Sequence, residues 1–232
     1  MQPETPLMAQ TSTISAPALA RNRVLRNTYM LLGISMVPTV LGAWLGLQLK
    51  FSLMPGHPAI GMIAFLAIAF GFFYGIEKTK NSGWGVALLL GFTFFMGLML
   101  ARMLGVILGL ANGAQLIALA FGGTAVIFTA MATIATTTKR DLSGMGKFLF
   151  VGVILLLLAM FANIFLQIPA MMIALSVIAI GIFSAFMLFD VNRIVTGGET
   201  NYISATLALY LDIYNVFVNL LAILGITSGS ND

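Results

Sequence analysis

The chain has 232 residues, a formal net charge of +4, 60% hydrophobic residues and only 8% charged residues. A soluble domain carries about 25% charged residues and about 45–50% apolar ones, so this composition excludes an ordinary water-soluble protein. There is no cysteine, which excludes disulfides and thiolate metal sites. We expect an all-α, polytopic membrane protein, because helices satisfy their own backbone hydrogen bonds in lipid.

The chain divides into a polar tail and seven apolar segments. Residues 1–27 are rich in Ser, Thr and Pro, and we expect them to form a largely disordered N-terminal tail. Seven segments follow that are each long enough to cross about 30 Å of hydrocarbon. We expect these spans at 28–49, 59–76, 84–104, 114–137, 147–167, 170–194 and 202–226. The predicted domains are the tail, a seven-helix transmembrane domain at 28–226 and a short external tail at 227–232.

The basic residues predict the orientation, since loops rich in Lys and Arg stay in the cytoplasm. With the N-terminus in the cytoplasm, nine of the 11 basic residues fall on that side: Arg21, Arg23, Arg26, Lys78, Lys80, Lys139, Arg140, Lys147 and Arg193. Lys50 and Arg102 fall on the other side. Topology therefore accounts for the positive charge without a nucleic-acid partner, and membrane lipid is the expected surrounding. The C-terminus is expected outside.

Two of the seven acidic residues, Asp190 and Asp212, lie inside apolar runs. A charge in the hydrocarbon costs about 2.5–3.5 kcal/mol and usually marks function or a contact within the bundle. Asn215 and Asn219 follow Asp212 at i+3 and i+7, so the seventh span has a polar stripe that cannot face lipid. Arg193 lies one helical turn after Asp190 and is placed to pair with it.

Simple counting does not bring the two aspartates to the same depth. At about 1.5 Å per residue, Asp190 lies about 6 Å and Asp212 about 15 Å from the same membrane face. Contact requires a tilted helix or a later start of the seventh span. If they meet, the two carboxyls titrate as a coupled pair, and a proton or a transiently bound divalent cation would neutralise them. The alternative is that each aspartate only bonds a neighbouring helix.

Motifs for catalysis and for cofactors are missing from this sequence. The single histidine, His57, has no partner cysteine for zinc and no serine motif beside it. Paired aspartates on adjacent spans also occur in intramembrane aspartyl proteases, but Leu209-Tyr210-Leu211 precedes Asp212 where those enzymes have Gly-x-Gly. We therefore expect no enzymatic activity and no cofactor. Gly42-x-x-x-Gly46, Gly71-x-x-x-Gly75 and Gly105-x-x-x-Gly109 are expected to permit close helix packing.

Several motifs resemble a known family. Leu188-Phe-Asp190-x-Asn192-x-Ile194 and Leu207-x-Leu-Tyr-Leu-Asp212-x-x-Asn215 resemble the Bax inhibitor-1 family of transmembrane Bax-inhibitor-motif proteins. Val24-Leu-Arg-Asn-Thr-Tyr29, Asn163-Ile-Phe-Leu-Gln167 and Gly197-Gly-Glu-Thr-Asn-Tyr-Ile203 look like its bacterial YccA-like branch. The resemblance runs from about residue 22 to residue 226 and implies seven helices, with the last near the centre of the bundle.

The resemblance implies two functions. Some members are pH-sensitive calcium leak channels gated by two aspartates in the last two spans, and Asp190 and Asp212 occupy the matching positions. This implies transport of Ca²⁺ or another cation. Channel-type members also carry an arginine late in the second span; here that region reads Tyr74-Gly-Ile-Glu77-Lys78, so Arg193 is the candidate substitute. The bacterial branch instead implies binding and regulation of the inner-membrane protease FtsH through the N-terminal tail.

Overall fold

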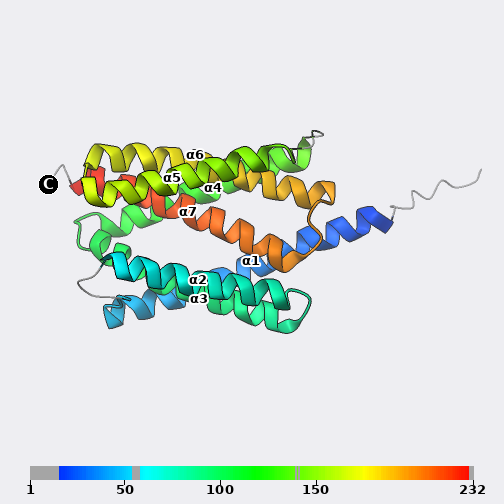
Figure 1. Cartoon of the computed structure of the whole chain (residues 1–232), viewed down its shortest axis with the longest axis horizontal. Helices are drawn as coiled ribbons and strands as arrows, with labels where there is room; N and C mark the ends of the chain where they lie inside the picture. The colour runs from blue at the N-terminus through cyan, green and yellow to red at the C-terminus, as the bar shows by residue number, and fades with distance from the viewer. Residues whose placement is uncertain (1–15, 54–57, 139, 141, 230–232) are drawn as a thin grey trace, which may run out of the picture.

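A computed structural model describes residues 16–53, 58–138, 140 and 142–229. Within these residues the chain forms seven α-helices (Figure 1), namely α1 (Ala16–Leu49), α2 (Pro58–Thr79), α3 (Gly83–Leu108), α4 (Gly113–Thr137), α5 (Met145–Leu166), α6 (Pro169–Thr196) and α7 (Tyr202–Gly229). All seven are long and apolar enough to cross a membrane. The prediction of seven transmembrane helices is confirmed.

The helix ends differ from the prediction at both termini. α1 begins at Ala16, so the prediction of a largely disordered tail is wrong for residues 16–27, which are helical. The reason is that Ala, Leu and Arg dominate this stretch and favour helix, while Pro17 stands in the first turn, where proline is tolerated. At the other terminus α7 continues to Gly229, beyond the predicted end at 226. Residues 1–15 and 230–232, which belong to the two predicted tails, lie outside the described residues.

The bundle is organised around α7. This helix contacts α1, α2, α3, α4 and α6, whereas α5 contacts only α6 and α2 contacts only α3 and α7. Figure 1 shows α7 running diagonally between a pair formed by α2 and α3 and a pair formed by α5 and α6. The expectation of a central last helix therefore agrees with the structure. Tyr210 and Leu209 of α7 are almost fully buried, with 1% and 0% exposure.

α1 and α3 pack most closely, because glycines let their backbones meet. Gly42 of α1 lies against the backbone of Phe94 and Leu98, and Gly97 of α3 lies against the backbone of Thr39 and Ala43. A β-carbon at either glycine would overlap the facing helix. This contact holds Thr39 beside α7, where its hydroxyl shares a hydrogen bond of 2.9 Å with the Tyr210 hydroxyl.

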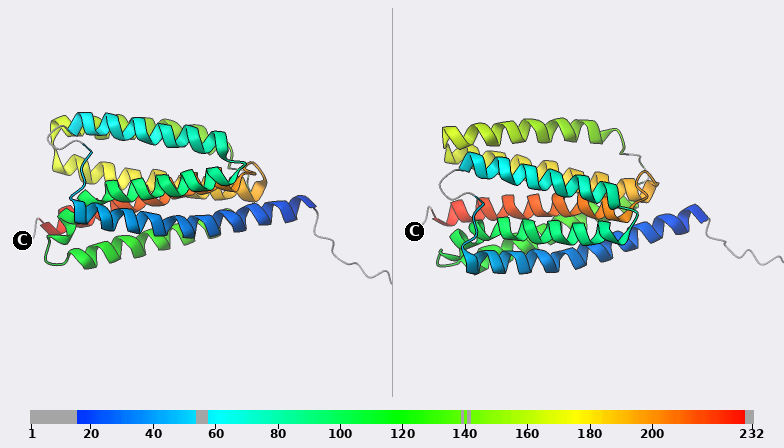
Figure 2. Two further views of the ribbon diagram at one scale, coloured as in Figure 1. Left: turned by 90° about the horizontal axis from the view of Figure 1, so that it is seen from below. Right: turned by 60° about the horizontal axis from the view of Figure 1, so that its bottom comes forward.

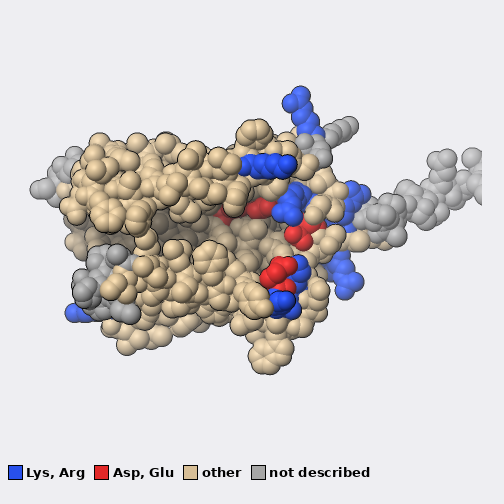
Figure 3. Space-filling model, in the orientation of Figure 1, with Lys and Arg blue, Asp and Glu red and all other residues tan. Residues whose placement is uncertain are grey.

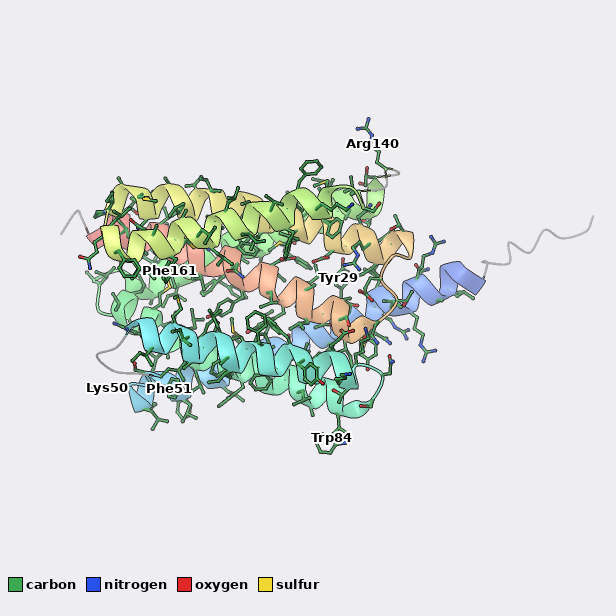
Figure 4. All side chains as sticks on the ribbon, in the orientation of Figure 1. Tyr29, Lys50, Phe51, Trp84, Arg140 and Phe161 are labelled. Carbon is green, nitrogen blue, oxygen red and sulfur yellow. The ribbon has the colours of Figure 1, made fainter. Side chains whose placement is uncertain are left out.

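The two ends of the bundle differ in charge. Lys, Arg, Asp and Glu side chains gather mostly at the end where α1 begins (Figure 3), which we call the charged end. Figure 4 shows Trp84 and Arg140 projecting from opposite flanks near this end, and Lys50 and Phe51 at the other. Trp84 is 74% exposed, as expected for an aromatic residue at a membrane interface.

Candidate aspartate site between α6 and α7

The C-terminal turn of α6 is built by the Gly197-Gly198 pair. Gly197 has φ +87°, a left-handed conformation that favours glycine at a helix end. The Gly198 and Glu199 amides then both donate to the Arg193 carbonyl, at 2.8 and 3.1 Å. This termination turns the chain sharply after α6, so that α7 begins at Tyr202 and runs back across the bundle (Figures 1 and 2).

The two aspartates meet despite their different predicted depths. Asp190 of α6 is 8% exposed and Asp212 of α7 is 5% exposed. Their carboxyl groups are close enough for one to hydrogen-bond to the other when a proton is shared. Because α7 begins where it was predicted to begin, the diagonal course of α7 brings them together. A tilted helix was one of the two arrangements that, from the sequence, would allow the aspartates to meet.

Arg193 links Asp190 to the loop after α6. One guanidinium nitrogen lies 3.7 Å from the Asp190 carboxylate, and another lies 3.5 Å from Glu199 Oε2. The guanidinium also lies over the Phe189 ring, 5.6 Å from its centroid, a distance typical of a cation–π contact. Asp190 and Glu199 therefore share one cation, and that cation is 38% exposed at its side chain.

Asp212 has a different environment from Asp190. Its Oδ2 atom is buried and has no hydrogen-bond partner among the described residues. Asn215 and Asn219 do not solvate it: each side-chain amide donates to the carbonyl four residues earlier on α7, both at 2.8 Å. A buried carboxylate oxygen without a donor is costly unless a proton or a cation neutralises it.

A metal ion would find few ligands at this site. Among the described residues there is no group of three or more His, Asp or Glu side chains that could hold one. The two carboxyls supply at most about four of the roughly 6–8 oxygens that Ca²⁺ prefers. Ca²⁺ bound at Asp190 and Asp212 would keep much of its hydration shell. Such weak coordination suits a transported ion better than a permanently bound one.

Two asparagines, whose roles the sequence did not predict, fasten the loops around the pair. Asn201 Oδ1 accepts from the Ile203 amide at 2.9 Å and so caps α7, while its Nδ2 donates to the Lys80 carbonyl at 3.0 Å. Asn192, 1% exposed, accepts from the Leu142 amide and donates to the Arg140 carbonyl, at 3.2 and 3.3 Å. Both residues stand in the quoted family motifs, and that was the only available signal.

A hollow lies on one side of the central helix α7. The backbone of α2 does not approach that of α5 or α6, and Figure 3 shows a deep recess between these helices with acidic side chains inside it, towards the charged end. α7 lies across this recess in the ribbon views (Figures 1 and 2). The half-buried Asn215 and Leu211 lie on α7 near Asp212.

These features define a class of protein: a seven-helix membrane bundle whose central last helix meets the preceding helix through two buried aspartates. The family model described as inhibitor of apoptosis-promoting Bax1 matches residues 21–229. The chain therefore belongs to the Bax inhibitor-1 family, and the predicted resemblance is confirmed.

Bacterial relatives cover nearly the whole chain. The modulator of FtsH protease YccA from Escherichia coli strain K12 is 39% identical over 210 residues, which are 90% of this chain and 93% of YccA. A membrane protein of Vibrio cholerae is 37% identical over 227 residues, 98% of this chain and 99% of the relative. A Neisseria meningitidis protein is 37% identical over 212 residues, 90% and 93% of the two chains. The resemblance to the YccA-like branch is thus confirmed as well.

Proposed function

We propose that the protein lets Ca²⁺ or a similar cation leak passively through the bacterial inner membrane, with Asp190 and Asp212 as its gate and proton sensor. One observation carries the proposal: two buried carboxyls from different helices meet, and one oxygen of Asp212 lacks a partner among the described residues. A permanent structural role would favour a fully bonded pair. A pair that exchanges a proton for a cation suits a regulated pathway.

The proposed path follows α7 from the charged end. Asp212, Asn215 and Asn219 provide polar atoms along the first two-thirds of this helix. Beyond Asn219 the sequence is apolar from Leu220 to Ile226, which would stop an ion by excluding water. In this proposal the helices around that apolar segment separate when the charge on the aspartate pair changes. Arg193, which is itself paired with Glu199, holds Asp190 in place at the entrance, so Arg193 acts as the latch.

Liposome flux tests this function. Purified protein would be reconstituted in liposomes with a Ca²⁺ dye inside, and entry would be recorded at pH 6 and pH 8. We expect entry above that of empty liposomes, with a rate that differs between the two pH values. Asp190→Ala and Asp212→Ala should each abolish this difference. Glu77→Gln is the matched control, because Glu77 is an exposed acid at the same end. Flux equal to that of empty liposomes at both pH values would refute the proposal.

We also propose that the charged end faces the cytoplasm. The described Lys and Arg residues at this end belong to the short loops and helix ends that the distribution of basic residues assigns to the cytoplasm. The N-terminus is then cytoplasmic and the C-terminus external. The proposed role is transport or binding, without a catalytic step.

A second function, modulation of FtsH, is favoured by a separate observation. The chain is similar over nearly its whole length to a protein named as a modulator of that protease. The start of α1 extends beyond the rest of the bundle at the charged end (Figure 1), and Arg23 is exposed close to this extension. We propose that this extension, together with the residues before it, contacts FtsH at the cytoplasmic face.

Co-purification tests the second function. Tagged protein should retain FtsH from solubilised membranes, and deletion of residues 1–20 should remove it. Replacement of the same residues by a scrambled sequence of equal composition is the control for length and charge. Absence of FtsH from the full-length preparation would refute this function and leave the flux experiment unaffected.

A further inference from the structure

A long slot separates α1 from α4 on the outside of the bundle. The backbones of the two helices do not approach each other closely, although each helix packs against α7 and the two touch through the Tyr29 and Phe128 rings. Between them lies a cavity of about 380 Å³, whose rims include Met36 and Val40 of α1 and Phe121 of α4, and whose floor includes Tyr210 and Phe217 of α7. Figure 2 (left) shows α4 spreading away from α1 towards the end where the C-terminus lies. The slot therefore opens to the lipid and reaches the central helix.

The slot is lined mostly by apolar side chains, and three of the hydroxyl groups on its walls are already bonded within the protein. Tyr210 shares a hydrogen bond with Thr39 at 2.9 Å, Tyr214 donates to the Met96 carbonyl at 3.2 Å, and Thr124 donates to the Ala120 carbonyl at 2.7 Å. A water molecule needs about 2–4 polar partners to occupy a cavity. The slot does not offer them, so its natural occupant is a hydrocarbon chain.

A polar cavity follows at the charged end of the same helix pair. It measures about 340 Å³ and is lined by Arg21, Asn22, Leu25, Thr136 and Val195. The Arg21 guanidinium donates to the Val195 carbonyl at 3.3 Å, which fixes its positive charge at this cavity. The Tyr29 and Phe128 rings, in edge-to-face contact at 5.9 Å, lie between the polar cavity and the apolar slot. A cation at the membrane surface above an apolar slot matches the two parts of an anionic lipid.

We propose that an anionic glycerophospholipid of the surrounding leaflet binds between α1 and α4. Its phosphate lies against Arg21, and one acyl chain crosses the Tyr29–Phe128 pair and enters the slot on α7. The chain then contacts Tyr210, two residues from Asp212. Bound lipid thus supports the part of α7 that carries the aspartate site, which makes the lipid composition of the membrane a regulator of this helix.

Photo-crosslinking in vesicles tests the lipid site. The full-length protein would be reconstituted in equimolar phosphatidylethanolamine and phosphatidylglycerol, with a trace of phosphatidylglycerol that carries a diazirine on one acyl chain. After illumination, labelled peptides would be mapped by mass spectrometry. We expect labelling to concentrate on the slot residues of α1, α4 and α7. Labelling spread evenly over all lipid-facing helices would overturn the proposal.

Two matched glycine variants separate the slot from the general lipid surface. Gly33 lines the slot, and a β-carbon there meets nothing within 4 Å, so Gly33→Leu should fold and fill the cavity. Gly71 of α2 is equally open, and Gly71→Leu is the control. Gly33→Leu should lower labelling of the α7 peptide several-fold, and Gly71→Leu should leave it unchanged. Equal labelling in both variants would also overturn the proposal.

A charge variant tests the headgroup. Arg21→Gln should reduce the preference for the phosphatidylglycerol probe over a phosphatidylethanolamine probe with the same acyl diazirine. One Arg near an anionic membrane surface contributes about 1 kcal/mol, or about fivefold in binding. Arg23→Gln is the control, because Arg23 belongs to the same helix but does not line the cavity. An unchanged preference in Arg21→Gln would show that the slot binds acyl chains without regard to headgroup and would refute the anionic assignment.

Discussion

Replacing Gly97 by alanine tests the α1–α3 contact that holds one side of α7. A β-carbon at Gly97 would lie 2.9 Å from both the Ala43 nitrogen and the Thr39 carbonyl carbon, and closer still to the Thr39 oxygen. Ordinary van der Waals contact begins at 3.4 Å. The two helices must therefore separate by at least about 0.5 Å, because the facing atoms are backbone and no change of rotamer can move them.

The expected cost follows from these distances. Overpacking a tight contact costs about 1–3 kcal/mol, and the upper value applies where backbone faces backbone. Alanine recovers about 1 kcal/mol, since it favours helix more than glycine does. We expect Gly97→Ala to lower the free energy of unfolding by about 2 kcal/mol, with some of the loss in the neighbouring Thr39–Tyr210 hydrogen bond.

Reversible unfolding in mixed micelles with increasing dodecyl sulfate would measure this difference. Gly71→Ala is the control, because a β-carbon at Gly71 meets nothing within 4 Å; it should be as stable as the parent or slightly more so. If Gly97→Ala and Gly71→Ala unfold within about 0.5 kcal/mol of each other, the size of an ordinary surface change, the reasoning about the backbone contact is wrong.

Three further predictions concern the charged end. Asn201→Ala should lower stability by about 1–2 kcal/mol through loss of the α7 cap. It should also speed hydrogen exchange in the α2–α3 turn, and unchanged exchange there would contradict a stabilising role for the Asn201–Lys80 hydrogen bond. In this cysteine-free chain, a membrane-impermeant thiol reagent added to intact cells should label Ser52→Cys but not Ser82→Cys, and the reverse would invert the proposed orientation. Arg193→Gln should raise the cation leak at both pH 6 and pH 8, and an unaltered flux profile would remove Arg193 from the gate. Its stability cost should be only about 1 kcal/mol, because the side chain is 38% exposed.

Hydropathy predicted the seven spans well because membrane helices must be long and apolar. The same reasoning identified Asp190 and Asp212, since acids inside apolar runs are costly and therefore conspicuous. Hydropathy could not predict that the two side chains meet. A depth counted along the sequence holds only for a helix perpendicular to the membrane, whereas packing against neighbouring helices sets the tilt. α7 begins at Tyr202 as predicted and meets α6 because it crosses the bundle diagonally (Figure 1).

The Gly-x-x-x-Gly motifs predicted close helix packing less well than hydropathy predicted the spans. Of the three small-residue motifs, Gly42-x-x-x-Gly46 packs against the α3 backbone. Gly71 meets nothing within 4 Å, and Gly105 meets only the end of the Leu47 side chain at 3.5 Å. The partner glycine that completes the α1–α3 contact, Gly97, is not part of a Gly-x-x-x-Gly motif. Sequence spacing gives the face of one helix, but the facing helix is a property of the fold.

The roles of Asn192 and Asn201 could not be predicted from the sequence either. Asn192 and Asn201 act through hydrogen bonds to backbone atoms of loops more than one helix away in the chain. An asparagine at the end of an apolar segment is common and carries no indication of its distant partner. Only their place within the family motifs distinguished these two residues from the others.

The central claim is that the Asp190–Asp212 pair senses protons and gates a cation path. The most direct measurement is the ratio of Ca²⁺ flux at pH 6 to that at pH 8 in liposomes, for the parent protein and for Asp212→Asn. Asparagine keeps the shape of the side chain but cannot ionise, so the account predicts that the ratio differs from one in the parent and becomes one in the variant. A variant whose flux depends on pH as the parent's does would contradict the account.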